Sequence, residues 1–508
     1  MSFELSYYEL RAIAIGQEAN SICGKRFPRD TDGVQLREIT MDLLHLAAIA
    51  LTLALCSCVI PPKLGPQQQT VANEQLGISS QWSAPVPVQA WWDTFNDPEF
   101  DRLMQLALAD NPSLAQAMAR VREAQSFADV TRAALAPSLS FNAGETRQRF
   151  SAHDIIPPPY AGTVQWKGRE VLNLSWDIDF WGRQASLLKQ ARTQTAAAAL
   201  DVASARLALS GAVAQAYLEL YRNNALADVA QRTEAQRERI LEITRRRVQS
   251  GLDTNVELHE ASGAVPETHV ELLQAQAGAA LDTHQLAALS GQGAGVCTQL
   301  RRPTLDPSAI LPLPAALPAD LLGHRPDVLA ARNRIEAARA GQAAAKAAFY
   351  PDINLASFAG TSAIGLGNLF RGASGAYGVG PAIHLPLFDA GRLRAEYRGA
   401  AAEIDDAIAA YNQSVLQAVR ETSDELSLVE ALNAQIVQQQ KSLDDAEAAY
   451  RLAEERYRAG LSTYLTVLTT ETAVLSARRD HVGLISDQAI ARVNLLLAVG
   501  GSFDPQAP

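Results

Sequence analysis

Two sets of acidic residues have a spacing that chemistry on a substrate could use. Asp177 and Asp179 stand two apart in an alternating segment, so a strand would place both carboxylates on one face, as acid and base catalysis would need. His259 and Glu260 match the first half of a zinc protease motif, but Gly263 stands where that motif needs its second histidine. We therefore expect no zinc site here and favour polar lining of a wet lumen for Asp177 and Asp179.

The rest of the sequence offers no other catalytic or metal-binding arrangement. No glycine-rich phosphate loop follows a strand, and no serine or cysteine nucleophile has a convincing partner. The four cysteines, Cys23, Cys56, Cys58 and Cys297, lack metal-ligand spacing. A net charge of −11 without a basic run argues against nucleic acid as a partner. We predict neither an enzyme, a metal site nor a nucleic-acid-binding protein.

An internal repeat sets the positions of these residues. The corner glycines Gly182 and Gly391 are 209 residues apart, and so are the later glycines Gly251 and Gly460. A constant offset between two pairs of landmarks indicates that one supersecondary unit occurs twice. Each interval is free of proline and, as a continuous helix, would be roughly 100 Å long.

The pattern within these intervals predicts long helices with a coiled-coil seam. In the second interval apolar residues recur at spacings of three, four or seven, from Ile404 to Tyr457. An ordinary coiled-coil stalk would show the same pattern and is one interpretation. The expected helices are 183–249 with a return helix at 253–290, and 391–459 with a return helix at 462–499.

Alternating segments before each long helix predict β-hairpins at 137–181 and 351–389. Apolar and polar residues alternate from Leu172 to Phe180 and again from Tyr377 to Leu387. Four strands cannot close a barrel, because narrow membrane barrels need eight, so the chain must oligomerise to cover its strand edges. A soluble sheet packed on the helices would also alternate. Aromatic residues near the strand ends and the length of the helices favour the membrane.

The N-terminal 57 residues predict a leader for export. The apolar run Leu43 to Leu55 is too short to span a bilayer and suits the core of a secretory signal. Residues 1–40 are interpreted as an extended leader or as translation from an upstream start, since Met41 directly precedes the run. Residues 58–96, rich in Pro, Gln and Ser up to Val88, predict a tether.

The end of the apolar run, from Leu55 to Cys58, resembles the lipobox of bacterial lipoproteins. The resemblance implies a covalent lipid on Cys58, which would be the mature N-terminus and the only cofactor. An ordinary signal with two chance cysteines is the alternative. After the tether, the expected organisation is a first repeat at 97–291, a connection at 292–319, a second repeat at 320–501 and a tail at 502–508.

Several motifs together resemble the outer membrane factor family, the TolC-like exit ducts of Gram-negative efflux systems. They are the lipobox, Trp91-Trp92 followed by Asp97-Pro98, the string from Leu317 to Asp327, and the corner from Phe388 to Arg392. The resemblance implies a mainly α fold with a membrane β-barrel, in which a homotrimer forms a 12-stranded barrel and a periplasmic α-barrel. It also implies an outer membrane location, a passive conduit for small molecules, and a periplasmic adaptor and an inner-membrane pump as partners.

The turns between the long and return helices are the expected docking and gating region. By the resemblance, Gly251, Leu252, Gly460 and Leu461 lie in turns that contact the adaptor, and Leu465 and Thr469 lie at gate positions. The family often has an aspartate where Thr469 stands, whereas the first repeat has Asp253, Glu257 and Glu260. We expect these three acids to form the constriction. The alternative is that they are solvated helix N-terminal acids, which the helix dipole favours.

A lipid-anchored adaptor or coiled-coil scaffold is the competing function. Adaptors also carry helical hairpins, typically one hairpin within a β-rich chain. This chain has two hairpins, and the predicted strands lie at the opposite end from the turn glycines. A scaffold would not need strands with one apolar face. The sequence therefore favours the duct.

Overall fold

The computed structural model describes residues 61–72, 76, 90–293, 295, 300–308, 311, 321–501 and 503. The chain divides into a larger unit, Pro61–Pro386 with Arg392–Pro508, and a smaller one, Met1–Ile60 with Leu387–Gly391. In the smaller unit only Leu387–Gly391 is described, where the Gly391 N–H donates to the Asp389 carboxylate at 3.0 Å. The predicted signal, Cys58 and residues 312–320 lie outside the described residues.

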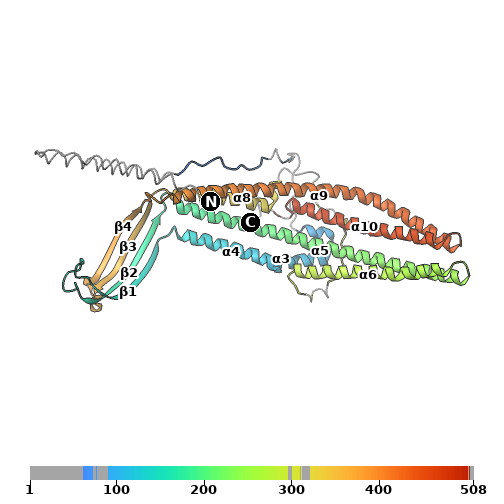
Figure 1. Ribbon diagram of the computed structural model, residues 1–508, viewed down its shortest axis with the longest axis horizontal. Helices are drawn as coiled ribbons and strands as arrows, with labels where there is room; N and C mark the ends of the chain where they lie inside the picture. Colours follow the sequence, from blue (N-terminus) through green and yellow to red (C-terminus); the bar gives the residue numbers. More distant parts are fainter. Residues whose placement is uncertain are drawn as a thin grey trace, which may run out of the picture. The chain divides into compact units, whose positions relative to one another are not determined.

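The larger unit contains two copies of one series of elements (Figure 1). The first copy consists of η2 (Trp91–Phe95), α3 (Pro98–Asp110), α4 (Pro112–Ala133), β1 (Ser138–Arg149), β2 (Val164–Ile178), α5 (Arg183–Gln249) and α6 (Asn255–Leu289). The second consists of α7 (Leu321–His324), α8 (Pro326–Ala347), β3 (Asp352–Ile364), η4 (Leu366–Asn368), η5 (Gly372–Ser374), β4 (Gly375–His384), α9 (Arg392–Arg458) and α10 (Tyr464–Ala498).

The long helices α5 and α9 have 67 residues each, and the return helices α6 and α10 have 35 each. Both long helices end in the same way. Gly251 and Gly460 adopt φ values of 72° and 79°, where a side chain would be strained. The N–H of the following leucine bonds back to Arg247 or Arg456, which satisfies carbonyls at the helix end in a Schellman arrangement. The turns are therefore fixed by local sequence.

The four strands form one antiparallel sheet in the order β1-β2-β3-β4, so β2 and β3 join the two repeats. In this register Leu172 lies between Phe141 of β1 and Ala359 of β3, which puts the apolar positions on one face. Many of these side chains are exposed, as expected for a face that a membrane would cover. The predicted alternation to Leu387 is too long, because β4 ends at His384 and Leu385 and Leu387 lie beyond it, on either side of Pro386.

Helix α5 is the centre of the helical packing. It contacts α3, α4, α6, α8 and α10, while α9 contacts α8 and α10. An extended segment at 61–72 lies against α9, where the Val71 N–H donates to Asn412 at 2.9 Å and Asn412 donates to the Gln69 carbonyl at 2.9 Å. Side chains from several elements close the largest core: Trp91, Trp92, Phe95, Phe100, Leu103, Tyr217, Leu286 and Val493.

Asp97 connects three parts of this core. Its carboxylate caps α3 through the Glu99 N–H at 3.0 Å and accepts from the Tyr217 hydroxyl at 2.9 Å and the Thr304 N–H at 2.7 Å. Tyr217 in turn stacks on Phe100, with ring centroids 4.9 Å apart. The sequence predicted Asp97 as a helix cap. The structure adds that it joins α3, α5 and the connection between the repeats.

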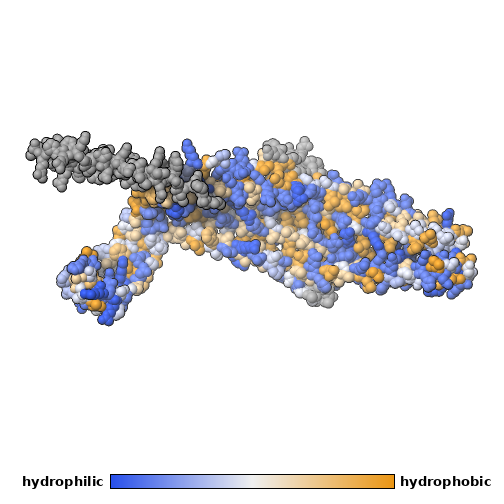
Figure 2. Space-filling view, in the orientation of Figure 1, coloured by the Kyte–Doolittle hydropathy of each residue, from blue (hydrophilic) through white to orange (hydrophobic). Residues whose placement is uncertain are grey.

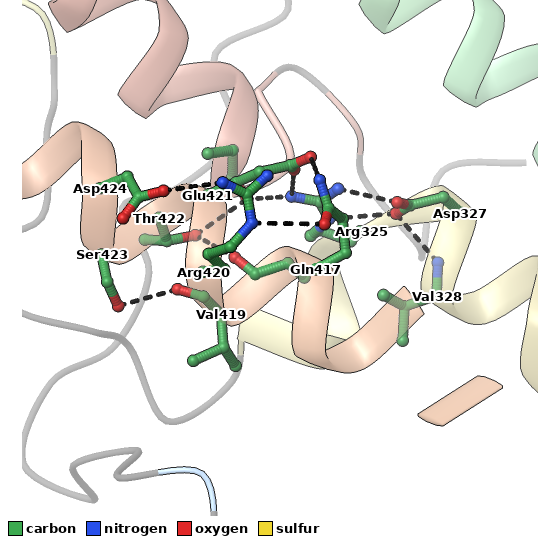
Figure 3. A network of polar contacts seen from close by, with 12 residues as sticks. Arg325, Asp327, Val328, Gln417, Val419, Arg420, Glu421, Thr422, Ser423 and Asp424 are labelled. Carbon is green, nitrogen blue, oxygen red and sulfur yellow. Dashed lines mark hydrogen bonds and ion pairs between the residues drawn. The ribbon is translucent and has the colours of Figure 1, made fainter. Parts of the chain in front are cut away.

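Arg325 performs a similar role in the second repeat (Figure 3). Its guanidinium pairs with Asp327 at 2.7 Å and Glu421 at 2.9 Å and donates to the Ala498 carbonyl at 3.0 Å. It therefore connects the beginning of α8, the middle of α9 and the end of α10. Because Ala498 is the last residue of α10, the cation also binds where the helix dipole is negative.

Candidate functional site

The turns between the long and return helices carry four exposed apolar side chains. Leu252 is 65% exposed and Leu461 is 79% exposed, and Val256 and Leu465 one turn later are exposed as well. The pairs Leu252/Leu461 and Val256/Leu465 are each separated by the repeat offset of 209 residues. Hydrophobic and hydrophilic residues mix at this end of the helices in Figure 2. Each chain thus presents two equivalent apolar tips.

A polar cluster binds the two hairpins to one another beside these tips; we call Arg247, Asp253, Tyr457 and Thr244 the tip latch. Arg247 donates to both oxygens of Asp253, at 2.8 and 3.1 Å, and to the Tyr457 carbonyl at 2.8 Å. The Tyr457 hydroxyl donates to Asp253 at 2.6 Å and lies 2.9 Å from the Thr244 hydroxyl. Residues of α5, of its following turn and of α9 are therefore held together.

Burial strengthens the tip latch. Tyr457 is fully buried, and the guanidinium carbon of Arg247 lies 4.5 Å from the centroid of its ring. Hydrogen bonding from Arg247 lowers the pKa of Asp253 below its ordinary value of 3.8, with a further contribution from Tyr457. Burial, together with the bond to Asp253, raises the pKa of Tyr457 to about 12. The latch is thus a carboxylate held between a cation and a protonated phenol at neutral pH.

The sign of the Asp253 shift gives a pH prediction. Because the folded pKa is depressed, the stabilisation from Asp253 is fully present above its ordinary value of 3.8 and is lost only as pH falls through the lower folded value. We expect the difference in melting temperature between the parent and Asp253→Asn to stay constant between about pH 8 and pH 5. Thermal unfolding of both proteins at several pH values measures it, and a difference that disappears near pH 6 would contradict this assignment.

The three acids predicted for the constriction occupy different environments. Asp253 is neutralised within the tip latch. Glu257 closes a capping box at the start of α6, where its carboxylate accepts from the Thr254 N–H at 2.9 Å while the Thr254 hydroxyl accepts from Val256 at 3.1 Å. Glu260 is exposed and has no hydrogen bond or ion pair among the described residues. Of the three, Glu260 alone presents a free carboxylate within the described part of the chain.

The two positions predicted from the second repeat are also exposed. Leu465 points away from the core, and the Thr469 hydroxyl donates to the Leu465 carbonyl at 2.8 Å within α10. Thr469 therefore spends its donor on its own helix. Glu260 and Thr469 occupy equivalent positions, 209 residues apart, so the first repeat has an acid where the second has a hydroxyl.

The acid pair on the strand is divided between two roles. Asp177 lies in β2 and accepts a hydrogen bond from Asn354 of β3, on the polar face of the sheet. Asp179 lies after the end of β2 and caps α5, accepting from the Gln184 N–H at 3.0 Å and the Ala185 N–H at 2.7 Å. Among the described residues no three His, Cys, Asp or Glu side chains are grouped to hold a metal ion.

Sequence reasoning assigned Tyr457 to the helix seam and did not single out Arg247. Only a comparison of the two repeats could have identified this contact from the sequence. The position equivalent to Tyr457 in the first copy is Val248, and the position equivalent to Asp253 in the second copy is Ser462. A buried tyrosine and an acid that each occur in one copy alone indicate a contact made once per chain rather than a seam common to both repeats.

Comparison with known proteins identifies the family. Residues 103–292 and 317–501, which include both helical hairpins, match the outer membrane efflux protein family. The chain belongs to this family. This outer membrane efflux protein is 34% identical over 373 residues to the fusaric acid resistance protein FusA of Burkholderia cepacia, covering 72% of this chain and 70% of FusA. It is 32% identical over 472 residues to the toluene efflux pump outer membrane protein TtgF of Pseudomonas putida, covering 91% and 97%.

Solved structures agree with this assignment. The outer membrane efflux protein is similar to the outer membrane protein VceC of Vibrio cholerae, with a TM-score of 0.77 and 34% identity, covering 82% of this chain and 100% of VceC. It is also similar to the open state of the MtrE outer membrane channel of Neisseria gonorrhoeae, with a TM-score of 0.72 and 25% identity, covering 87% and 98%.

These comparisons confirm three predictions for this outer membrane efflux protein. It is an outer membrane channel and serves as an exit duct of tripartite efflux. Its fold class is mainly helical, with four strands per chain that a trimer completes into a membrane β-barrel, and its location is the outer membrane. Channels of this family transport molecules and work with an adaptor and an inner-membrane pump. The competing adaptor or scaffold function is not supported.

Proposed function

We propose that the tip latch is the closed gate of this duct, and that small molecules pass when it opens. The observation that carries the proposal is the contact of Tyr457 with Asp253, because it connects the two hairpins of one chain where the helices end. While it is intact the tips of α9 and α10 cannot separate from those of α5 and α6. Opening requires the buried Tyr457 hydroxyl and the Asp253 carboxylate to find other partners.

Glu260 and Leu465 are proposed as the side chains that line the closed gate. Both are exposed in a single chain, and they lie one to three turns past the turn glycines. In a homotrimer three copies of Glu260 would meet around the axis and favour cations. Asp253 and Glu257 are less suited to this role, since their carboxylates are already bonded within the chain. Asp177 is proposed to line the wet interior of the barrel.

The apolar tips are proposed as the surface that binds the periplasmic adaptor. Leu252 and Leu461 directly follow Gly251 and Gly460, and both side chains are exposed. Contact of these apolar side chains with water is unfavourable, so a partner that covers them would stabilise the tips. Because the two tips of a chain are equivalent, each would offer the partner the same apolar contact. The tip latch lies directly beside the apolar tips, so an adaptor that binds the tips would affect the gate.

The docking proposal predicts a strong effect from two substitutions. Leu252→Asp/Leu461→Asp should abolish resistance to efflux substrates in cells. In the complex with the adaptor, each leucine contact would be replaced by a charge that has lost its water. Trimer yield and bilayer conductance should match the parent. A matched control is Leu452→Asp, which alters an exposed leucine that lies within α9 rather than in a turn. Retained resistance in the double variant, with normal expression, would refute the docking surface.

The N-terminal lipid is proposed on the lipobox resemblance of Leu55 to Cys58. Gln68 and Val71 bond to Asp405 and Asn412 of α9 and follow Cys58 by ten and thirteen residues, so the acylated end would be attached to the helical wall by a short connection. Mass spectrometry of the mature N-terminal peptide tests this proposal. A diacylglyceryl-modified Cys58 is expected, and an unmodified N-terminus elsewhere in the chain would contradict it.

A further inference from the structure

A second polar cluster lies deeper between the helices. Arg237 of α5 and Glu471 of α10 are each 6% exposed and pair at 3.2 Å. The same guanidinium donates to the Ala264 carbonyl of α6 at 2.7 Å and to the Glu267 carboxylate at 3.0 Å. The Arg237 side chain therefore connects its own helix, α5, with α6 of the same hairpin and α10 of the other. We call Arg237, Glu471, Glu267 and the Ala264 carbonyl the Arg237 cluster.

The position of the Arg237 cluster connects it to the tips. Arg237 precedes Arg247 of the tip latch by ten residues on the same helix, which is about 15 Å along its axis. In α6 the cluster adjoins Pro266, the proline inside that helix. Proline has no N–H for the carbonyl four residues earlier, that of Ser262, so the helix is weakened at this point. Arg237 thus binds α6 two residues from the place where the helix bends most easily.

The Arg237 cluster breaks the symmetry of the repeat. The positions equivalent to Arg237, Glu471 and Pro266 are Ala446, Ser262 and Leu475. These equivalent positions, in α9, α6 and α10, carry no charge, so the packing that the two repeats share does not require such a group. A buried ion pair is also a poor source of stability, because well-packed apolar residues of the same volume are often as stable. Stability alone therefore does not explain the cluster, whereas a fixed arrangement of helices does.

We propose that Arg237 is a positioning residue of the periplasmic gate, which sets the spacing of α5, α6 and α10 so that the tip latch can form. The inference rests on the proposed gate function. A guanidinium has planar, fixed donor directions, so it holds Glu471 and the Ala264 carbonyl at one separation, which flexible apolar packing would not. Between the Arg237 cluster and the turns, the ends of the helices are free to move. Pro266 lets the tip of α6 move while the Arg237 cluster remains in place.

The test compares stability with conductance in reconstituted trimers. Arg237→Met/Glu471→Met removes both charges and keeps the volume, so the melting temperature should equal or exceed that of the parent. Open probability should nevertheless rise by about tenfold, because the latch is no longer aligned. Arg237→Lys keeps the charge and loses the planar fork, so an intermediate rise is expected. Matched controls are Arg239→Met, an exposed arginine of the same helix, and Glu447→Gln, which removes the half-buried pair with Arg478.

The outcomes are separable. A stable double variant with increased open probability, and controls at the parental level, supports the positioning role. A stable double variant that stays closed overturns it, because the cluster would then be structural only. If the double variant forms no trimer, Arg237→Lys decides: parental conductance overturns the inference and a rise supports it. Failure of the proposed gate is a different result, in which breaking the tip latch with Tyr457→Phe leaves conductance unchanged while the parent channel conducts.

Discussion

Cells that depend on this channel should become about tenfold more sensitive to a large hydrophilic antibiotic when Asp253 is replaced by alanine, since breaking a buried ion pair is strongly destabilising. Without the carboxylate, Arg247 loses both of its salt-bridge contacts and the Tyr457 hydroxyl loses its acceptor at 2.6 Å. The closed arrangement would then contain a largely buried guanidinium without its carboxylate partner. Separation of the hairpins gives that cation access to water, so the open state gains relative to the closed one.

The minimum inhibitory concentration of vancomycin, at matched expression, measures this effect. Glu242→Ala is the matched control, because Glu242 is an acid near the end of α5 whose pairs with Arg245 and Arg246 lie on the surface. It should leave sensitivity unchanged. Tyr457→Phe keeps the buried ring and removes only the hydroxyl, so it should give a smaller increase in sensitivity. Parental sensitivity of Asp253→Ala would mean that the latch does not close the channel.

Replacing Asp97 by alanine should lower the free energy of unfolding by about 3 to 5 kcal/mol, the sum expected for a lost helix cap and two buried donors left without an acceptor. Asp97 is 2% exposed, and its carboxylate accepts from both the Tyr217 hydroxyl and the Thr304 N–H, so both donors lose their acceptor. Helices α3 and α5 and the connection between the repeats would loosen together. Trimers should melt at a clearly lower temperature.

Thermal unfolding followed by circular dichroism measures the loss. Asp306→Ala is a suitable control, since Asp306 lies in the same connection and is exposed, and its carboxylate accepts from the Ser308 N–H of its own turn at 2.9 Å. That change should cost within about 0.5 kcal/mol, as surface substitutions usually do. Equal melting temperatures for the two variants would show that Asp97 does not stabilise the core.

Local pattern was sufficient for the helices and strands, whereas the trimeric barrel was predicted from the resemblance to the family. The 209-residue offset and the coiled-coil spacing follow from helix geometry, and alternation follows from the pleat of a strand, so both are visible in a single sequence. The pairing of β2 with β3 is different, because it joins strands that α5, α6 and α8 separate in the chain. The contacts of Asp97 have the same character. Its cap on Glu99 is local and predictable, whereas Tyr217 and Thr304 lie 120 and 207 residues away.

The same distinction divides the candidate site. The turn glycines and the capping box from Thr254 to Glu257 are local signals, but the capping box was not recognised in the sequence, which is why Glu257 was predicted for the constriction. The tip latch is not local. Tyr457 meets Asp253 across 204 residues, and its burial and hydrogen bonding follow from the packing of two hairpins rather than from either sequence segment. An acid near a helix start looks the same in sequence whether it faces a lumen or an arginine.

The most direct test of a gated duct is the single-channel conductance of purified protein in a planar bilayer, with the parent and Asp253→Ala measured side by side. We predict small, cation-selective conductance for the parent and long, large openings for the variant. Equal conductance in both, from correctly inserted trimers, would remove the latch from the gate. Trimers that insert and never conduct, even with the latch broken, would contradict a conduit that opens at the tips of its helices.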